Sequence, residues 1–126
     1  MNPFGHVDLR VRNFAKDLPF YEKLLPALGF TRTFHSTEWR VFATKGELPS
    51  AAYFAIAEHP GDRPNQNMIG FWAESPQEVD RIADLVRESG GKITSGPQHF
   101  PISSSYYAVY FEDPCGNPFE VTYRID

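Results

Sequence analysis

The segment "HVDLRV", residues 6–11, sets the pattern from which the rest of the sequence can be organised. Apolar residues alternate with His6, Asp8 and Arg10, a period of two that is typical of a strand with one buried face. The three polar side chains are therefore expected to share the other face of the strand. A similar segment, "MIGFWA", begins at Met68, 62 positions later.

Each of these segments is followed by a helical pattern and then by three strand-like runs. In the first half, residues 14–28 place apolar side chains at steps of three and four before Gly29, which predicts a helix that ends there. Pro19 and Pro26 lie within this pattern, and we expect them to confine or distort the ends of the helix. The strand-like runs that follow are residues 30–36, 38–44 and 51–58.

The second half repeats this order after a connector rich in Pro, Gly, Asn and Asp, residues 59–67. Ser75 and Pro76 predict the start of a helix that continues over residues 77–89. Its apolar stripe consists of Val79, Ile82 and Val86. The remaining strand-like runs are residues 92–96, 105–113 and 118–125, with a tight turn at 113–117.

The order β-α-β-β-β, written twice, predicts an α+β protein built from two paired modules. Module one covers about residues 4–58 and module two about residues 68–126, within a single domain of 126 residues. Each half has only ~60 residues and would be marginally stable alone, so pairing of the two modules is expected.

The composition restricts the class of partner. A net charge of −4 without any block of Lys or Arg indicates neither a nucleic-acid partner nor an anionic membrane surface. No apolar stretch approaches the ~18 residues that a membrane span requires. A single cysteine, Cys115, is consistent with a reducing compartment, and we expect a cytoplasmic protein.

Four residues are candidates for chemistry. The offset of 62 aligns His6 with Met68 and Glu58 with Glu120. If the modules pack about a pseudo-two-fold axis, these four side chains converge on one place. Imidazole and carboxylate groups are suitable ligands for a divalent cation such as Zn, Ni, Mn or Fe. Met68 offers a soft thioether instead, and we expect it to pack as an apolar group.

Three segments resemble the vicinal oxygen chelate superfamily, which includes glyoxalase I, extradiol dioxygenases, fosfomycin-resistance thiol transferases and bleomycin-binding proteins. These segments are "GHVDLRVRNFAKDLPFYEKLLPALGF", "MIGFWAESPQEVDRIADLVRESGGKI" and "YYAVYFEDPCGNPFEV". The last is the most specific, because an aromatic strand precedes D-P-x-G-N and a glutamate follows three places later. The resemblance implies two paired βαβββ modules that form a cupped mixed sheet around a central cavity, within a homodimer.

The resemblance also implies roles for individual residues. His6 matches the first metal ligand of the family and Glu120 the last, whereas Met68 stands where metal-binding members commonly have histidine. Glu58 matches an additional carboxylate ligand of glyoxalase-type members. His59 takes that place if the alignment slips by one residue, which would turn the side chain to the other face of the strand.

An arrangement without an ion is the alternative. His6 and Glu120 would then be polar residues of the cavity, hydrogen-bonded to one another or to Arg10. The loop at residues 97–107 either covers the cavity or is a plain connection. The residues expected to line a substrate pocket are Asp8, Arg10, Met68, Trp72 and Tyr106.

Two functions remain as hypotheses, and both have a small-molecule ligand. The first is a glyoxalase-like lyase or isomerase, in which a divalent metal polarises substrate oxygens and Glu120 or Glu58 transfers a proton. Without a histidine at Met68, the extradiol dioxygenase and thiol transferase patterns are disfavoured. The second is a metal-free protein of bleomycin-resistance type that sequesters an aromatic or antibiotic-like molecule.

Overall fold

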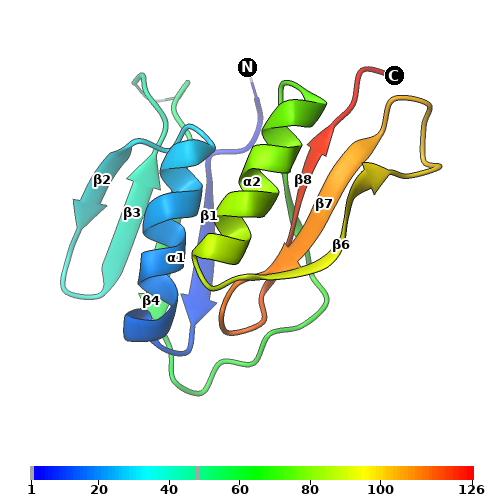
Figure 1. Ribbon diagram of the computed structural model, residues 1–126. Helices are drawn as coiled ribbons and strands as arrows, with labels where there is room; N and C mark the ends of the chain where they lie inside the picture. Colours follow the sequence, from blue (N-terminus) through cyan, green and yellow to red (C-terminus); the bar gives the residue numbers. More distant parts are fainter. Residues whose placement is uncertain (1, 48) are drawn as a thin grey trace. The chain divides into compact units, whose positions relative to one another are not determined.

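The structure is a computed structural model that describes residues 2–47 and 49–126. The chain divides into two compact units, Met1–Arg63 and Pro64–Asp126, and the boundary falls within the connector expected at residues 59–67. Each unit contains one helix and one four-stranded mixed sheet, in the order β-α-β-β-β (Figure 1). The α+β class and the repeated order of elements are therefore as predicted.

Unit one holds a sheet with the strand order β1-β4-β3-β2. The first and last strands of the unit, β1 and β4, are parallel neighbours, and the other pairs are antiparallel. Parallel neighbours require a crossover connection, which α1, β2 and β3 provide here. The elements are β1 (His6–Val11), α1 (Phe14–Ala27), β2 (Arg32–His35), β3 (Trp39–Ala43) and β4 (Tyr53–Glu58).

Aromatic side chains hold α1 against one face of this sheet. The helix begins after Asn13, whose side-chain oxygen accepts a hydrogen bond from the Lys16 amide at 3.2 Å. Tyr21 of α1 stacks on Phe54 of β4, with ring centroids 6.2 Å apart, and Phe30 meets the same ring edge-on. The opposite face, called the open face below, is therefore left to the polar and aromatic side chains of the sheet.

The prolines of α1 do not limit the helix as the sequence suggests. The helix runs through both Pro19 and Pro26 and ends before Gly29, which has a φ of 103°. Each proline removes one backbone hydrogen bond, but burial of large side chains offsets this loss. The fully buried apolar residues of the helix are Phe20, Tyr21, Leu24 and Leu25.

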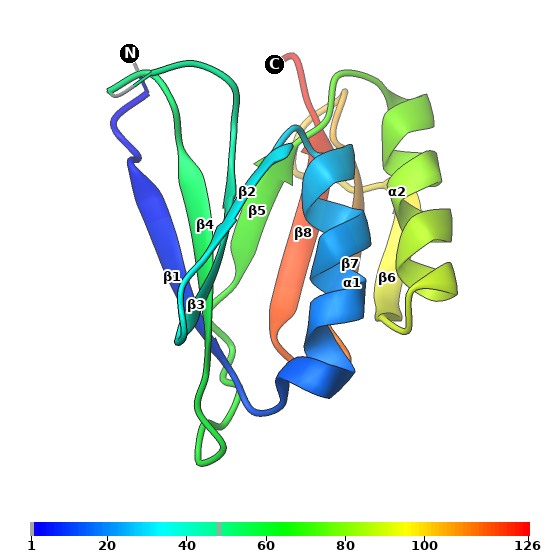
Figure 2. The same ribbon diagram turned by 90° about the vertical axis from the view of Figure 1, so that its left-hand side faces the viewer.

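Unit two repeats the topology with the strand order β5-β8-β7-β6, and its first and last strands, β5 and β8, are again parallel neighbours. Its helix, α2, lies against β6, β7 and β8 (Figure 2). The elements are β5 (Ile69–Trp72), α2 (Pro76–Glu88), β6 (Lys92–His99), β7 (Tyr107–Glu112) and β8 (Pro118–Tyr123).

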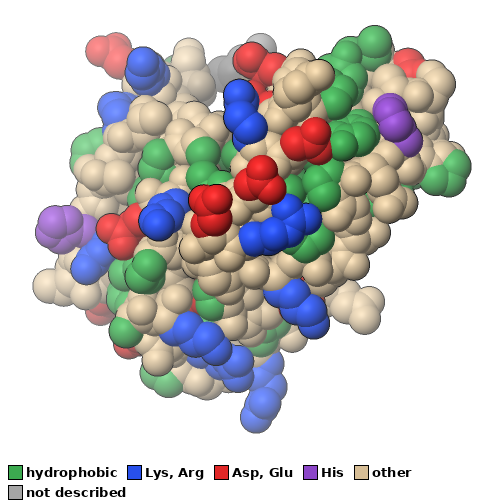
Figure 3. Space-filling view, in the orientation of Figure 1, with side chains coloured by type: hydrophobic (Ala, Val, Ile, Leu, Met, Phe, Trp, Pro, Cys, Tyr) green, Lys and Arg blue, Asp and Glu red, His purple; other side chains and the backbone are tan. Residues whose placement is uncertain are grey.

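Helix α2 has the start and the buried face that the sequence predicts. The Ser75 hydroxyl accepts a hydrogen bond from the Glu78 amide at 3.1 Å and so caps the helix. Its buried residues are Val79, Ile82, Ala83 and Val86. Acidic and basic side chains are interspersed over the outer face of α2 (Figure 3), and Arg87 pairs with Asp84 at 3.1 Å.

Strand β6 is longer than predicted. The sequence suggests an end at Gly96, whereas the strand continues to His99 through a cis bond between Gly96 and Pro97. The ladder with β7 is irregular there and resumes where Gln98 pairs with Ala108. The expected loop at residues 97–107 is therefore reduced to a turn at residues 100–106, which lies at the end of the β6–β7 hairpin.

The turn between β7 and β8 is built around a buried carboxylate. Asp113 accepts hydrogen bonds from the Cys115 amide at 2.9 Å, the Asn117 amide at 2.8 Å and the Asn117 side chain at 2.8 Å. Gly116, with a φ of 104°, supplies the left-handed conformation at which other residues would be strained. This turn fixes the residue at which β8 begins, and hence the register that places Glu120 beside Gly70 of β5 and Tyr110 of β7.

Replacing the turn carboxylate tests this dependence. Asp113→Ala leaves buried amide donors without an acceptor, and we expect it to lower the free energy of unfolding by roughly 3 kcal/mol in chemical denaturation. Asp84→Ala, at an exposed position on α2, is the control and should change it by less than about 1 kcal/mol. Equal effects of the two substitutions would contradict the role of Asp113.

Candidate functional site

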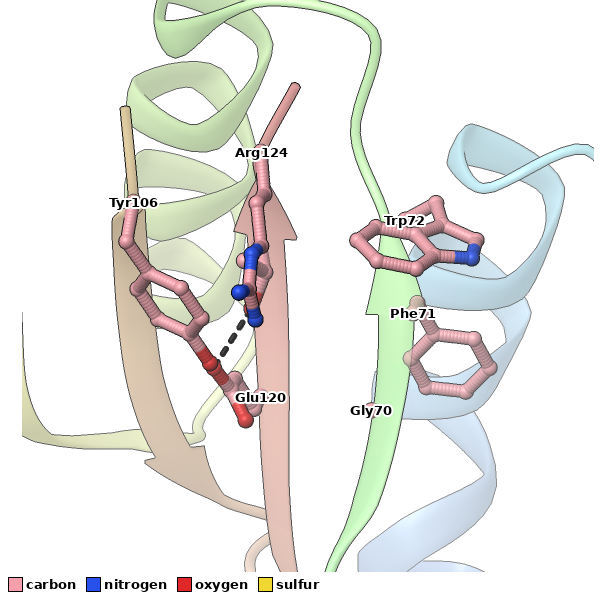
Figure 4. Close-up of a pocket in the computed structure, with 7 residues that line it drawn as sticks. Gly70, Phe71, Trp72, Tyr106, Glu120 and Arg124 are labelled. Carbon is pink, nitrogen blue, oxygen red and sulfur yellow. Dashed lines mark hydrogen bonds between the residues drawn. The ribbon is translucent and has the colours of Figure 1, made fainter. Parts of the chain in front are cut away.

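The open face of unit two carries a pocket around Glu120. Glu120 and Thr122 of β8 share this face with Gly70 and Trp72 of β5, since alternate residues of a strand point to one side. The pocket has a volume of about 270 Å³. Its lining residues, shown in Figure 4, are Gly70, Phe71, Trp72, Tyr106, Glu120, Thr122 and Arg124.

The Glu120 carboxylate is held by hydroxyl groups. Its Oε2 accepts hydrogen bonds from the Tyr106 hydroxyl and from the Thr122 hydroxyl, the latter at 2.5 Å. Tyr110 of β7 stands directly opposite Glu120 in the sheet. Burial raises the pKa of Tyr110 above its ordinary value, and hydrogen bonds with Tyr106 and Glu120 raise it further. Glu120 thus forms part of a cluster with three hydroxyl-bearing side chains.

The parallel register of β5 and β8 explains why this carboxylate remains accessible. Gly70 is the direct neighbour of Glu120, and a Cβ atom at Gly70 would lie 3.9 Å from Oε1. The missing side chain leaves space beside Oε1, while the hydroxyl donors named above bind Oε2. Trp72, two residues along the same strand, is 72% exposed and offers an aromatic surface next to the carboxylate.

The open face of unit one carries the polar residues of β1. His6 stacks on Tyr53 of β4 with ring centroids 4.6 Å apart, and its Nε2 lies 3.6 Å from the Asp8 carboxylate. The Arg10 guanidinium lies over the Trp39 ring, 4.6 Å from its centroid. His6, Asp8 and Arg10 therefore share one face of the strand, as the alternation in "HVDLRV" predicts.

The structure does not bring Glu58 close to His6, with which it was expected to share a metal or catalytic site. In the parallel pair, His6 stands opposite Tyr53 and Glu58 stands opposite Val11, so they lie at opposite ends. The carboxylate of Glu58 instead accepts a hydrogen bond from the Phe14 amide at 2.8 Å, at the positive end of α1. The alternative ligand, His59, follows Glu58 and lies at this same far end of the strand pair.

The register also shows why the sequence comparison of the two halves misleads at Glu58. Asp8 matches Gly70 at an offset of 62, but the residue paired with Asp8 is Ala55, which matches Glu120 at an offset of 65. The constant offset therefore holds for the first strands of the modules and fails for the last. The position in unit one that corresponds to Glu120 has no carboxylate.

Comparison with known proteins assigns this fold to a family. The family model of the Glyoxalase/Bleomycin resistance protein/Dioxygenase superfamily matches residues 4–121, which is nearly the whole chain. The chain belongs to this superfamily. No functionally curated protein matches its sequence.

Solved structures agree with the superfamily assignment. A glyoxalase/bleomycin resistance protein from Albidiferax ferrireducens T118 is 26% identical, with a TM-score of 0.78 over 96% of this chain and 98% of that chain. The fosfomycin resistance protein FosX from Listeria monocytogenes is 19% identical, with a TM-score of 0.72 over 99% and 95%. A glyoxalase-related enzyme from Fulvimarina pelagi is 15% identical, with a TM-score of 0.75 over 98% and 89%. The last two likenesses concern the fold alone.

The residues present do not fit the divalent metal that members of the superfamily commonly use. Met68 is 47% exposed and offers a thioether, and Ala55 offers no ligand at all. Across residues 2–47 and 49–126, the structure gathers no group of three or more His, Cys, Asp or Glu side chains suited to a metal ion.

Neither helix among the residues that the structure describes has the length and hydropathy needed to span a bilayer.

Two residues that line the pocket beside Glu120, Thr122 and Arg124, are not predicted from the sequence. Thr122 is two residues further along the same strand, so alternation alone places it on the same face. Arg124 lies beyond the end of β8, and its guanidinium carbon is 5.6 Å from the centre of the Tyr106 ring. The contacts of Tyr106 depend on the β6–β7 turn, for which the sequence carries no comparable signal.

The contact between Glu120 and Tyr110 can be tested by titration. Because the carboxylate raises the pKa of Tyr110, Glu120→Gln should lower that pKa, although burial will keep it above the ordinary value. The measurement is a pH titration of the ¹³Cζ signals of labelled tyrosines, with Tyr110→Phe for assignment.

A matched control exists on the other side of the sheet. The Tyr107 hydroxyl donates to Asp80 at 2.6 Å, and this hydrogen bond is the main cause that raises the pKa of Tyr107. Asp80→Asn should therefore lower the pKa of Tyr107 and leave that of Tyr110 in place. If Glu120→Gln leaves the Tyr110 titration where it is in the wild type, the hydroxyl–carboxylate cluster does not exist as described.

Proposed function

We propose that this protein binds a small organic molecule without the aid of a metal, in the manner of the bleomycin-resistance members of the superfamily. The observation that carries this proposal is the Glu120 carboxylate, which Tyr106 and Thr122 hold on the open face beside Trp72. A fixed carboxylate next to an exposed indole suits a ligand that combines a positive charge with an aromatic or apolar surface. A cationic aromatic molecule meets both requirements.

The hydrogen bonds to Glu120 favour binding because they fix the orientation of the carboxylate in advance. Two donors on Oε2 orient the carboxylate before the ligand arrives, so less conformational entropy is lost when the ligand binds. The space above Gly70 lets a donor group approach Oε1. The cation would then be bound between a charge-assisted hydrogen bond and the face of Trp72.

A metal-dependent lyase or isomerase is the second candidate. In its favour, His6 is exposed on β1 and lies close to the Asp8 carboxylate. Against it, Glu58 points to the start of α1 and lies at the far end of the strand pair from His6. The proposal therefore assigns Glu120 the role of ligand acceptor, and His6 no role in holding an ion.

Ligand charge decides between a carboxylate site and a plain apolar pocket. We expect benzylammonium, which carries N–H donors, to bind and quench Trp72 fluorescence, and phenylacetate, of similar apolar surface but opposite charge, to bind much more weakly. Glu120→Gln should weaken binding of the cation about tenfold. Glu88→Gln, at an exposed position near the end of α2, is the control and should bind as the wild type does. Preference for the anion, or no effect of Glu120→Gln, would contradict the proposal.

Metal analysis separates the two candidate functions. Protein purified without chelator or added metal should contain no stoichiometric divalent ion, and titration with Ni, Zn, Mn or Fe should show no tight site. Met68→His should gain affinity for Ni or Zn, because residue 68 directly precedes β5 and lies two residues before Gly70, the strand neighbour of Glu120. Tight stoichiometric binding by the wild type would favour the metal-dependent enzyme instead.

The proposal includes a homodimer. Large apolar side chains outside the Glu120 pocket are exposed in each unit, among them Phe34 and Ile102. Exposed apolar surface of this kind commonly marks an interaction site. Sedimentation equilibrium would then give twice the chain mass of 14.3 kDa, and a mass of one chain would refute this part of the proposal.

A further inference from the structure

Three consecutive serines converge on one carboxylate at the edge of unit two. The hydroxyl of Ser103 donates to Asp126 Oδ1 at 2.8 Å, and the hydroxyls of Ser104 and Ser105 donate to Oδ2 and Oδ1 respectively. The Ser105 amide adds a fourth hydrogen bond to Oδ1 at 3.3 Å. These donors, Ser104 foremost, hold the pKa of Asp126 well below its usual range. The proposed ligand contacts do not involve this cluster.

The turn and the segment after β8 each donate hydrogen bonds to the other. The Ile125 amide donates to the Ser105 hydroxyl at 3.0 Å, so the segment at residues 124–126 also donates a hydrogen bond to the turn at residues 100–106. Within the segment itself, Arg124 Nε donates to the Asp126 backbone oxygen. We call this set of contacts the serine latch, made of Ser103, Ser104, Ser105, Ile125 and Asp126.

Both segments joined by the serine latch carry a wall of the Glu120 pocket. Tyr106 follows Ser105 directly, and its backbone oxygen accepts a hydrogen bond from the Phe100 amide at 3.0 Å. Arg124 belongs to the other segment, and its side chain lies beside Tyr106 above Glu120 (Figure 4). The turn and the segment after β8 therefore set the position from which the Tyr106 hydroxyl reaches Glu120.

If the serine latch served only to stabilise the fold, its removal would mainly lower the free energy of unfolding. The latch lies at the surface, where exchange of a serine–carboxylate hydrogen bond for one to water changes the free energy of unfolding little. A small displacement of Tyr106 nonetheless breaks a hydrogen bond that depends strongly on distance and angle. Loss of the latch should accordingly affect the pocket more than the stability of the fold.

We propose that Asp126 is a positioning residue for the ligand site, acting through the three serines to hold Tyr106 against Glu120. This inference rests on the proposed function for its consequence in ligand binding, but the placement of Tyr106 can be measured without any ligand. Asp126 itself does not touch the ligand. Its carboxylate orders the turn, the turn places Tyr106, and Tyr106 orients the acceptor.

The test combines one ligand-free and one ligand-dependent readout. In ¹³Cζ-tyrosine-labelled protein, Asp126→Ala should shift the Tyr106 signal in the same direction as Glu120→Ala does, because both remove the hydrogen bond of the Tyr106 hydroxyl. Binding of benzylammonium should weaken about fivefold in Asp126→Ala. Asp126→Asn retains an oxygen acceptor for the serines, so both readouts should stay closer to the wild type.

Two further variants keep the test decisive. The double variant Ser104→Ala and Ser105→Ala removes the latch from the other side and should reproduce Asp126→Ala, even if one variant folds poorly. Asp84→Ala, on α2, should leave the Tyr106 signal unchanged. An unmoved Tyr106 signal in both latch variants would overturn the inference. If the signal moves but the wild type itself binds no cationic probe, the latch stands and the proposed function fails.

Discussion

Parallel pairing of the first and last strands of each module is the constraint on which the rest of this structure depends. It requires the crossover through one helix and two strands, and it leaves one face of each sheet open. Its register also decides which side chains become neighbours on the open face. Glu120 stands beside Gly70, whereas Glu58 stands beside Val11 at the far end of the strand pair.

Features determined by nearby residues could be predicted from the sequence. The alternation in "HVDLRV" predicts the exposed face of β1, Ser75 predicts the start of α2, and the Asp113 turn is marked by its composition. Features that depend on the register between strands far apart in the sequence could not be predicted in this way. A period of two says which face Glu58 occupies but not which end of the sheet, and a difference of three residues between the modules invalidates the alignment there.

The same constraint bears on the proposal that this protein binds a ligand without a metal. A metal centre needs donors of suitable type on several strands, so Met68 and Ala55 together remove much of the set. The carboxylate that remains, Glu120, is stabilised by hydroxyl donors from its own strand and from the β6–β7 turn. In this protein the open face of unit two thus presents an oriented acceptor, which suits recognition of a donor or cation.

The central claim is that hydroxyl groups, not a metal ion, hold the Glu120 carboxylate. Diffraction from crystals grown with Mn²⁺, recorded where the anomalous signal of manganese is strong, tests it most directly. The account predicts no ordered ion at Glu120 and a Tyr106 hydroxyl still bound to Oε2. An ion bound to the Glu120 carboxylate, with Tyr106 displaced from it, would contradict the account.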